Sequence, residues 1–227
     1  MVLLVIVRHG ESLWNLENRF TGWMDVQLSD KGKDEAKNAG VALKSYHFEK
    51  IFISHLTRSI ETMHILLDAM HELRTQTIYH VDDPQILGRE HSSQESTNEL
   101  KIIQSKSLAE RYYGQLQGLN KDDCRKKWGE EQVHIWRRSF DVQPPGGESL
   151  KDTLTRVLPF YNHYVVPELK QGHNILIVAH GNSLRAIIKH LEDISDEEIP
   201  NYELATGVPI VYDLDHNLKV MSKKELK

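Results

Sequence analysis

Two stretches of the chain are apolar at every position, and each ends in a histidine followed by a glycine. The first covers residues 3–7 and leads into Arg8-His9-Gly10; the second covers residues 175–179 and leads into His180-Gly181. A continuous apolar run of this length indicates a strand buried on both faces, as in a parallel sheet. Open α/β sheets bind ligands at the carboxyl ends of their strands. If the two strands are neighbours, both histidines therefore enter one pocket.

The periodicity of apolar residues assigns most of the remaining chain to regular elements. We expect a third buried strand at residues 51–53 and a terminal hairpin that pairs residues 209–214 with 218–221. Helices are expected from Ser29 to about residue 43, after the 51–53 strand to Met70, and over residues 121–140, 150–165 (kinked at Pro159) and 183–191. Strands that alternate with helices predict an α/β fold with a mostly parallel sheet flanked by helices on both faces.

Residues 81–147 interrupt this alternation. We interpret them as a cap subdomain of helices and loops, inserted into a single domain of residues 1–227 and lying over the carboxyl ends of the strands. Residues 81–107 are polar and rich in Ser, Gln, Glu, Thr and Asn. Such a composition predicts a long loop or a partly disordered insertion.

Composition narrows the class of partner. The chain has 28 basic and 33 acidic residues, a net charge of −5, which disfavours nucleic acid and anionic membranes as main partners. Cys124 is the only cysteine, so we expect no intramolecular disulfide and a cytoplasmic location. The apolar start is cut off by Arg8 and is too short for a signal or a membrane span. With no His-x-x-x-His pair or Cys cluster, we expect no metal site.

The repeated histidine motif carries the chemistry. A single His-Gly is more often a loop residue bonded to nearby backbone than a catalytic group. Two matching copies after buried strands, Val-Arg-His-Gly-Glu-Ser and Val-Ala-His-Gly-Asn-Ser, favour a catalytic pocket instead. Arg58 follows the 51–53 strand and would lie on the same edge of the sheet. A surface arginine is the default interpretation, but beside this pocket a clamp for phosphate or carboxylate is favoured.

The chain resembles a known family. Arg8-His9-Gly10-Glu11-Ser12 resembles the signature of the histidine phosphatase superfamily. Further segments resemble its cofactor-dependent phosphoglycerate mutases: Glu17–Trp23, Glu110–Gly114, Leu116–Lys121, Trp136-Arg137-Arg138, His180–Arg185 and Thr206–Pro209. The resemblance covers nearly the whole chain except residues 85–107.

The resemblance implies a reaction and roles within it. The family interconverts 3-phosphoglycerate and 2-phosphoglycerate through a phosphohistidine primed by 2,3-bisphosphoglycerate, in glycolysis and gluconeogenesis. A neutral imidazole is nucleophilic at neutral pH and can pass a phosphoryl group on. By resemblance, His9 is that nucleophile, and Glu110 is the acid/base. On sequence alone Glu110 is equally well a surface glutamate; a dry, closed pocket would raise its pKa.

The same resemblance supplies the other site residues. Arg8, Arg58 and His180, with the Asn182 amide, would surround the phosphoryl oxygens. The substrate-binding residues it implies are Arg8, Ser12, Asn15, Thr21, Gly22, Arg58, Glu110, Tyr113, Lys121, Arg137, Arg138, Gly181 and Asn182. For Arg137-Arg138 a solvated helix face is the alternative. The implied partners are small-molecule phosphoglycerates, and a homodimer and a homotetramer both stay open.

Some features depart from the family pattern. Tyr112 stands where histidine is common, residues 85–107 are extra, the segment before Glu148 is shortened, and the chain ends soon after the last predicted strand. We expect these differences to affect the exclusion of water and hence the balance between mutase and phosphatase activity. A phosphatase of the same superfamily, acting on a small phosphorylated metabolite, is the alternative function. A catalytically silent binding module and a metal-dependent mutase are further alternatives.

Overall fold

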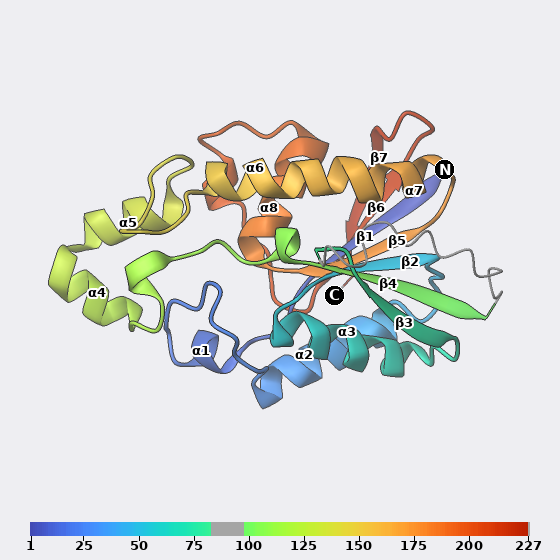
Figure 1. Cartoon of the computed structure of the whole chain (residues 1–227), viewed down its shortest axis with the longest axis horizontal. Coiled ribbons are helices and arrows are strands. Elements are labelled where there is room, and N and C mark those ends of the chain that lie inside the picture. The colour runs from blue at the N-terminus through green and yellow to red at the C-terminus, as the bar shows by residue number, and fades with distance from the viewer. Residues whose placement is uncertain (83–97, 227) are drawn as a thin grey trace.

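The computed structural model describes residues 1–82 and 98–226. Within them lies one seven-stranded sheet of order β3-β4-β2-β5-β1-β6-β7 (Figure 1). The first five strands in this order are parallel, and β6 is antiparallel to both of its neighbours, β1 and β7. The strands are β1 (Val2–Arg8), β2 (Lys50–Ser54), β3 (Thr75–His80), β4 (Glu99–Ser105), β5 (Ile175–Ala179), β6 (Pro209–Leu214) and β7 (Val220–Glu225). The prediction of a mostly parallel sheet is confirmed.

The two fully apolar strands are neighbours. β1 pairs with β5 in parallel, with Arg8 opposite Ala179. The pairing continues one residue further, because the N–H of His9 donates to the carbonyl of Ala179 over 2.9 Å. The next residue after each strand is therefore a histidine on the same edge of the sheet, as the sequence predicted.

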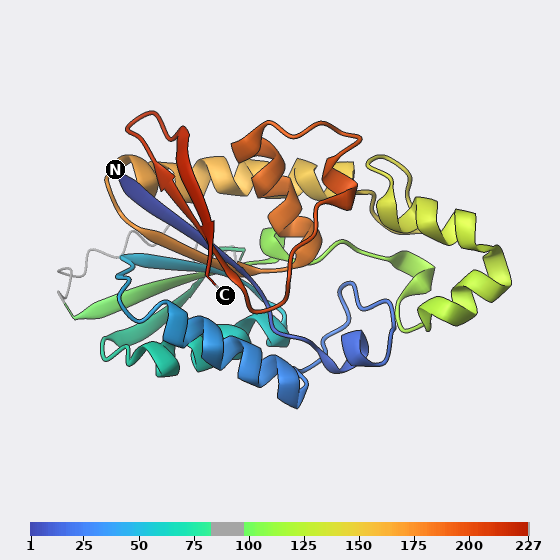
Figure 2. The ribbon, with the colours of Figure 1, turned by 180° about the vertical axis from the view of Figure 1, so that it is seen from behind.

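Helices cover both faces of the sheet, as expected (Figures 1 and 2). The helices are α1 (Leu13–Leu16), α2 (Asp30–Ala42), α3 (Thr57–Met70), α4 (Lys121–Trp128), α5 (Glu130–Arg138), α6 (Leu150–Phe160), α7 (Val166–Lys170) and α8 (Gly181–Glu192), with a π-helical turn at Tyr161–Val165 and 3₁₀ turns at Lys106–Leu108, Gly114–Leu116 and Ile199–Asn201. Alternate residues of β1 enter two cores: Leu4 and Ile6 pack with α6 and α8, whereas Val5 and Val7 pack with α2 and α3. Period-two alternation in a two-sided sheet requires this division.

The pair α2–α3 is held close by a glycine. A Cβ on Gly40 would lie 2.3 Å from the carbonyl oxygen of Leu66, so only glycine fits this contact. The Ser29 side chain caps α2 by accepting from the N–H of Gly32, as predicted. Regular α geometry gives way two residues after Pro159, where the π-helical turn begins. A proline without an N–H donor accounts for the irregularity predicted there.

The structure corrects three elements of the sequence prediction. Residues 99–105 were expected in a loop but form β4, which pairs on both sides with β2 and β3. β3 was not predicted, because this edge strand is polar and largely exposed and so lacks alternation. The rest of the expected insertion, residues 83–97, lies outside the described residues. The helix expected over residues 121–140 is broken at Gly129, which has φ 85° and separates α4 from α5.

The end of the molecule toward which the parallel strands run carries α1, α4 and α5 (Figures 1 and 2). Helices α4 and α5 share a small core of their own with Phe20 and Leu116; it is formed by Phe20, Leu116, Cys124, Val133 and Trp136. The division into one domain with an inserted cap at residues 81–147 stays a prediction, although β4 belongs to the sheet. Among the described residues, no helix has both the length and the apolar character needed to span a membrane.

Candidate active site

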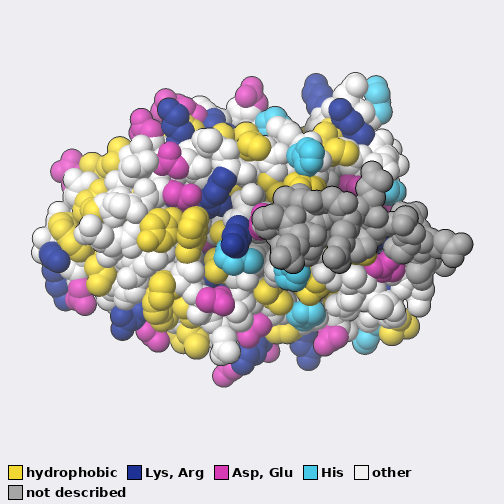
Figure 3. Space-filling view, in the orientation of Figure 1, with side chains coloured by type: hydrophobic (Ala, Val, Ile, Leu, Met, Phe, Trp, Pro, Cys, Tyr) yellow, Lys and Arg dark blue, Asp and Glu magenta, His cyan; other side chains and the backbone are white. Residues whose placement is uncertain are grey.

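A pocket of about 250 Å³ opens at the carboxyl ends of the parallel strands. Its lining residues are Arg8, His9, Asn15, Arg19, Phe20, Thr21, Gly22, Arg58, Glu110, Tyr113, Lys121, Arg137, Arg138, Gly181, Asn182, Arg185 and Glu203. Arginine and lysine side chains outnumber the two carboxylates, Glu110 and Glu203. Figure 3 shows acidic and basic side chains intermixed on the face it displays. The pocket suits a small polyanion.

His9 is held as a neutral imidazole with one nitrogen bonded to its own loop. Its side chain is buried, and Nδ1 lies 2.7 Å from the carbonyl oxygen of Gly10. A carbonyl only accepts, so Nδ1 carries the proton and Nε2 keeps its lone pair. Burial, with the charges of Arg58 and Arg8, holds the pKa of His9 well below 6.5 despite the bond to Gly10. The loop after His9 is fixed against α2, because a Cβ on Gly10 would meet the carbonyl oxygen of Gly32 at 2.2 Å.

His180 lies fully buried beside His9, with ring centroids 4.9 Å apart. Neither ring nitrogen has a hydrogen-bond partner among the described residues. Burial, followed by the charge of Arg58, also holds its pKa well below 6.5. Buried polar groups in proteins are almost always hydrogen-bonded. The unpartnered nitrogens of His180 therefore point to a bound group that supplies the missing partner.

Two arginines complete the inner part of the pocket. Arg58 is 1% exposed and donates to the carbonyls of Met24 and Gly22 over 3.0 and 2.7 Å. Arg8 donates to the carbonyl of Leu204 over 2.8 Å, and its buried Nε has no partner among the described residues. Burial lowers the pKa of Arg58 to about 10, so the group stays charged. Because neutral carbonyls hold these cations in place, their charge remains available to an anion.

Glu110 faces these cations with one oxygen engaged. Its Oε1 accepts from the N–H of Arg111 over 2.7 Å and from the Asn182 side chain over 2.7 Å. No described residue donates to Oε2. Burial alone would raise the pKa of Glu110, but these hydrogen bonds, together with Arg8 and Arg58, lower it below the ordinary value. The expectation of a raised pKa is therefore wrong for this structure. The carboxyl is buried, but hydrogen-bond donors fixed by the protein stabilise its charged form.

The outer part of the pocket crowds cations together. Lys121 is largely buried, and burial followed by the charges of Arg137 and Arg8 lowers its pKa to about 8. Burial, the largest cause, also lowers the pKa of Arg137. Arg138 is already engaged, because it donates to Glu203 and to the carbonyl of Pro200, each over 2.8 Å. Like charges held this close favour a ligand with more than one negative group.

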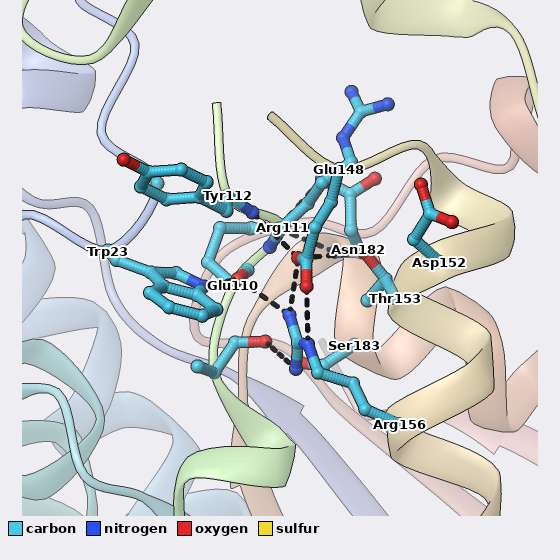
Figure 4. Close-up of polar contacts among 12 residues, drawn as sticks. Trp23, Glu110, Arg111, Tyr112, Glu148, Asp152, Thr153, Arg156, Asn182 and Ser183 are labelled. Atoms are coloured by element: carbon cyan, nitrogen blue, oxygen red, sulfur yellow. Dashed lines mark hydrogen bonds and ion pairs between the residues drawn. The ribbon is translucent and has the colours of Figure 1, made fainter. Parts of the chain in front are cut away.

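The structure brings most predicted site residues into this pocket. Arg8, His9, Asn15, Thr21, Gly22, Arg58, Glu110, Tyr113, Lys121, Arg137, Arg138, Gly181 and Asn182 line it. Ser12 and His180 do not line it. Ser12 caps α1, accepting from the N–H of Asn15 over 3.3 Å, and His180 is fully buried beside His9. The predicted role of Ser12 in binding stays a prediction. Tyr112 lies behind the lining, where its ring packs on Trp23 at a centroid distance of 4.9 Å (Figure 4).

Sequence reasoning missed Arg19, Phe20, Arg185, Glu203 and the buried Arg111. Arg185 follows Gly181 by one helical turn on α8, so helical spacing could have placed it in the pocket. Arg111 is 1% exposed and has two guanidinium nitrogens without partners among the described residues. It is adjacent to Glu110, and its Nη2 donates to the hydroxyl of Tyr113 over 3.0 Å. Glu203 has no comparable sequence signal. Among the described residues, no group of three potential ligands could hold a metal ion.

Comparison with known proteins gives one consistent family. The model of the histidine phosphatase superfamily (branch 1) matches residues 4–81 and 87–224. The chain is 48% identical over 230 residues to the 2,3-bisphosphoglycerate-dependent phosphoglycerate mutase 1 of Gloeobacter violaceus, covering 100% of this chain and 99% of that protein. It is 50% identical over 224 residues to the phosphoglycerate mutase of Schizosaccharomyces pombe, covering 98% and 94%.

Solved structures share the fold at lower identity. YhfR of Bacillus stearothermophilus matches with a TM-score of 0.74 at 23% identity, covering 97% of this chain and 94% of that one. A mycobacterial glucosyl-3-phosphoglycerate phosphatase matches with a TM-score of 0.75 at 20% identity, covering 99% and 97%. At these identities the likeness concerns the fold alone.

Proposed function

The chain belongs to branch 1 of the histidine phosphatase superfamily and, within it, to the 2,3-bisphosphoglycerate-dependent phosphoglycerate mutases, and from this premise we propose that it interconverts 3-phosphoglycerate and 2-phosphoglycerate through a phosphoryl group carried on His9. The observation that carries the role of His9 is the 2.7 Å contact between its Nδ1 and the carbonyl oxygen of Gly10. A neutral ring whose Nδ1 is bound to Gly10 leaves Nε2 as the nucleophilic atom, inside a ring of cations. We place this activity in glycolysis and gluconeogenesis in the cytoplasm.

The pocket fits 2,3-bisphosphoglycerate. The unpartnered nitrogens of His180 and the unpartnered Nε of Arg8 suit phosphoryl oxygens next to His9. The outer cations Lys121 and Arg137 suit a second anionic group. When bound, 2,3-bisphosphoglycerate supplies the phosphoryl group that primes the enzyme. The fixed charges of the pocket supply the stabilisation for this chemistry, and we propose that no metal takes part.

Glu110 moves the proton. When a substrate hydroxyl attacks phosphorylated His9, an O–P bond forms, the N–P bond breaks and Nε2 regains its lone pair. We assign the hydroxyl proton to Oε2 of Glu110, the oxygen that has no donor among the described residues. The lowered pKa of this carboxyl keeps it ionised and ready to accept. In the reverse direction the same oxygen returns the proton to the departing alkoxide.

The remaining residues hold charge. The transition state of phosphoryl transfer spreads negative charge over three oxygens, so preorganised donors supply most of the catalysis. Arg8 and Arg58, whose charges act on His9, and His180, whose ring lies beside it, are the residues we assign to this role. An anion bound between Arg8 and Arg58 also weakens their pull on Glu110, which raises the pKa of the carboxyl when it must carry a proton.

A product assay tests the proposal against the phosphatase alternative, in which water replaces the second hydroxyl. The enzyme is incubated with 3-phosphoglycerate and a catalytic amount of 2,3-bisphosphoglycerate, and both 2-phosphoglycerate and inorganic phosphate are measured. We expect 2-phosphoglycerate to form faster. Faster release of inorganic phosphate would instead favour a phosphatase.

A further inference from the structure

An ion pair between Glu148 and Arg156 lies directly behind Glu110 (Figure 4). The contact is bidentate: Nε of Arg156 donates to Oε1 of Glu148 and Nη2 donates to Oε2, each over 3.0 Å. Glu148 precedes α6 by two residues and Arg156 lies within that helix, so the pair is anchored to a rigid element. Neither residue lines the pocket, and neither can touch a substrate there.

Arg156 uses its other donors on the backbone around Glu110. Nη1 donates to the carbonyls of Ser107 and Ala109 over 2.8 and 3.0 Å, and Nη2 donates to the carbonyl of Glu110 over 2.8 Å. A guanidinium has five N–H groups in a fixed fork. Two bonds to Glu148 and three to carbonyls engage all of them. The fork therefore fixes three carbonyls of one short segment relative to α6.

Glu148 binds the backbone of the same segment at a position after Glu110 in the chain. Its Oε2 accepts from the N–H of Tyr112 over 2.9 Å, and its own N–H donates to the carbonyl of Tyr112 over 2.7 Å. Trp23 adds a further donor, because its Nε1 lies 2.6 Å from the carbonyl oxygen of Glu110. The backbone on both sides of the carboxylate is thus tied to one ion pair (Figure 4).

The side chain of Glu110 is fixed separately, through the bonds from Arg111 and Asn182 to Oε1. These bonds set the direction of Oε2 only if the backbone of residue 110 stays in place. We propose that Glu148 and Arg156 are positioning residues for the reaction: they fix the backbone of residues 107–112 so that Glu110 presents Oε2 to the pocket. This inference rests on the proposed acid/base role of Glu110.

A purely structural role is the alternative, and a second ion pair provides the control. Lys50, the first residue of β2, pairs with Glu168. Their side chains are 23% and 15% exposed, close to the 21% and 19% of Arg156 and Glu148. Arg156→Gln, Glu148→Gln and Lys50→Gln each break one such pair. Thermal unfolding measures the structural cost of each change, and equilibrium binding of 3-phosphoglycerate, by calorimetry, checks that the pocket is intact.

Positioning predicts a loss in kcat and not in binding. Displacing a catalytic group by about an ångström can cost on the order of 10²-fold in rate. We expect Arg156→Gln and Glu148→Gln to approach this loss in kcat, with KM and the binding constant little changed. Lys50→Gln should lower Tm and leave kcat unchanged. Arg156→Lys keeps the charge but not the fork, so it should restore only part of kcat. Full activity of Arg156→Lys, or an equal loss in Lys50→Gln, would overturn the proposal.

Combination with Glu110→Gln separates the two proposals. If the pair acts through Glu110, then Arg156→Gln costs kcat in the wild-type background and nothing further in Glu110→Gln. The same fold-loss in both backgrounds would show that the pair does not act through Glu110 and would overturn the positioning role. If Glu110→Gln alone left kcat unchanged, the acid/base assignment itself would fail.

Discussion

The rings of His9 and His180 lie 4.9 Å apart between centroids, with their planes tilted by 58°, and both are buried as neutral imidazoles. Their roles are nevertheless different. The ring of His9 is oriented by a bond to its own loop, whereas that of His180 has no partner among the described residues. We propose that the first ring is the nucleophile and that the second binds the group that the first receives.

The first prediction concerns the site of phosphorylation. Exposure to 2,3-bisphosphoglycerate should add one phosphoryl group to the wild-type chain, in an acid-labile and base-stable form, because Nε2 of His9 is the available nucleophile. His9→Asn should lose both this modification and turnover. Mass spectrometry of the intact protein measures the modification. His64→Asn, at an exposed position of α3, is the control and should be modified normally. A modified His9→Asn would contradict the assignment.

The second prediction concerns the pH dependence of stability. The pKa values of His9 and His180 lie well below 6.5 in the folded state, so the unfolded chain binds more protons as the pH falls through 6.5. The free energy of unfolding should therefore decrease below this pH, by up to about 1.4 kcal/mol per pH unit for each histidine. Urea unfolding between about pH 7 and pH 5 measures the slope. In His9→Asn the slope should be smaller; an unchanged slope would contradict burial of a neutral ring.

The third prediction concerns Glu110. Glu110→Gln keeps a carbonyl oxygen for the donors of Arg111 and Asn182 but cannot accept the substrate proton. We expect kcat to fall on the order of 10²- to 10⁴-fold, the usual contribution of a general acid/base, while KM changes little. Steady-state kinetics in both directions test this. A parallel rise in KM with kcat unchanged would indicate a role in binding instead.

The fourth prediction concerns Glu203, a carboxylate in a pocket for anions. It pairs with Arg138 over 2.8 Å, but its side chain is 74% exposed, so the pair is weak and screened by salt. Glu203→Gln should free Arg138 and lower KM for 3-phosphoglycerate by about two- to fivefold at low ionic strength. The difference should vanish at high salt. The exposed pair Lys33–Asp30 offers a control: Asp30→Asn removes a carboxylate from a pair of which neither residue lines the pocket. An equal fall in KM in the control variant would show that the effect of Glu203→Gln does not come from Arg138.

The fifth prediction concerns metal ions. Arg8, Arg58 and the outer cations supply positive charge where phosphoryl transfer requires it, so the proposed mechanism uses no metal. Turnover should be unchanged after prolonged treatment with a chelator and removal of the chelator by gel filtration. A loss of activity that an added divalent ion restores would contradict the mechanism.

The fold was predictable where burial leaves a plain pattern in the sequence. β1 and β5 are apolar at every position because both faces are covered, and their adjacency put the two histidines together. β3 could not be predicted from the sequence, because an exposed edge strand contains few apolar residues and so shows no hydrophobic pattern. The break at Gly129 was missed because glycine within a helical pattern does not by itself distinguish a tolerated residue from a chain reversal.

The site was predictable as a set of residues but not as a set of interactions. The motifs identified His9, Arg58 and Glu110 correctly as neighbours, since all follow strands or line the same edge. The pKa of Glu110 was misjudged, because its sign depends on three donors that only the folded geometry brings to Oε1. The pairing of Glu148 with Arg156 is likewise a property of tertiary structure, which residue types and spacing do not reveal.

The pocket is supported on one side by the large cores of the sheet and on the other by the small core formed by Phe20, Leu116, Cys124, Val133 and Trp136. His9 and His180 follow central strands of the sheet, whereas Lys121 and Arg137 lie on helices that pack on a core of a few side chains. Regions with few buried apolar contacts open at a lower free energy than core strands do. Local opening of that small core would allow ligands to exchange while His9 and His180 keep their spacing. The part of the pocket that opens for ligand exchange is thereby separate from the part that holds the two histidines.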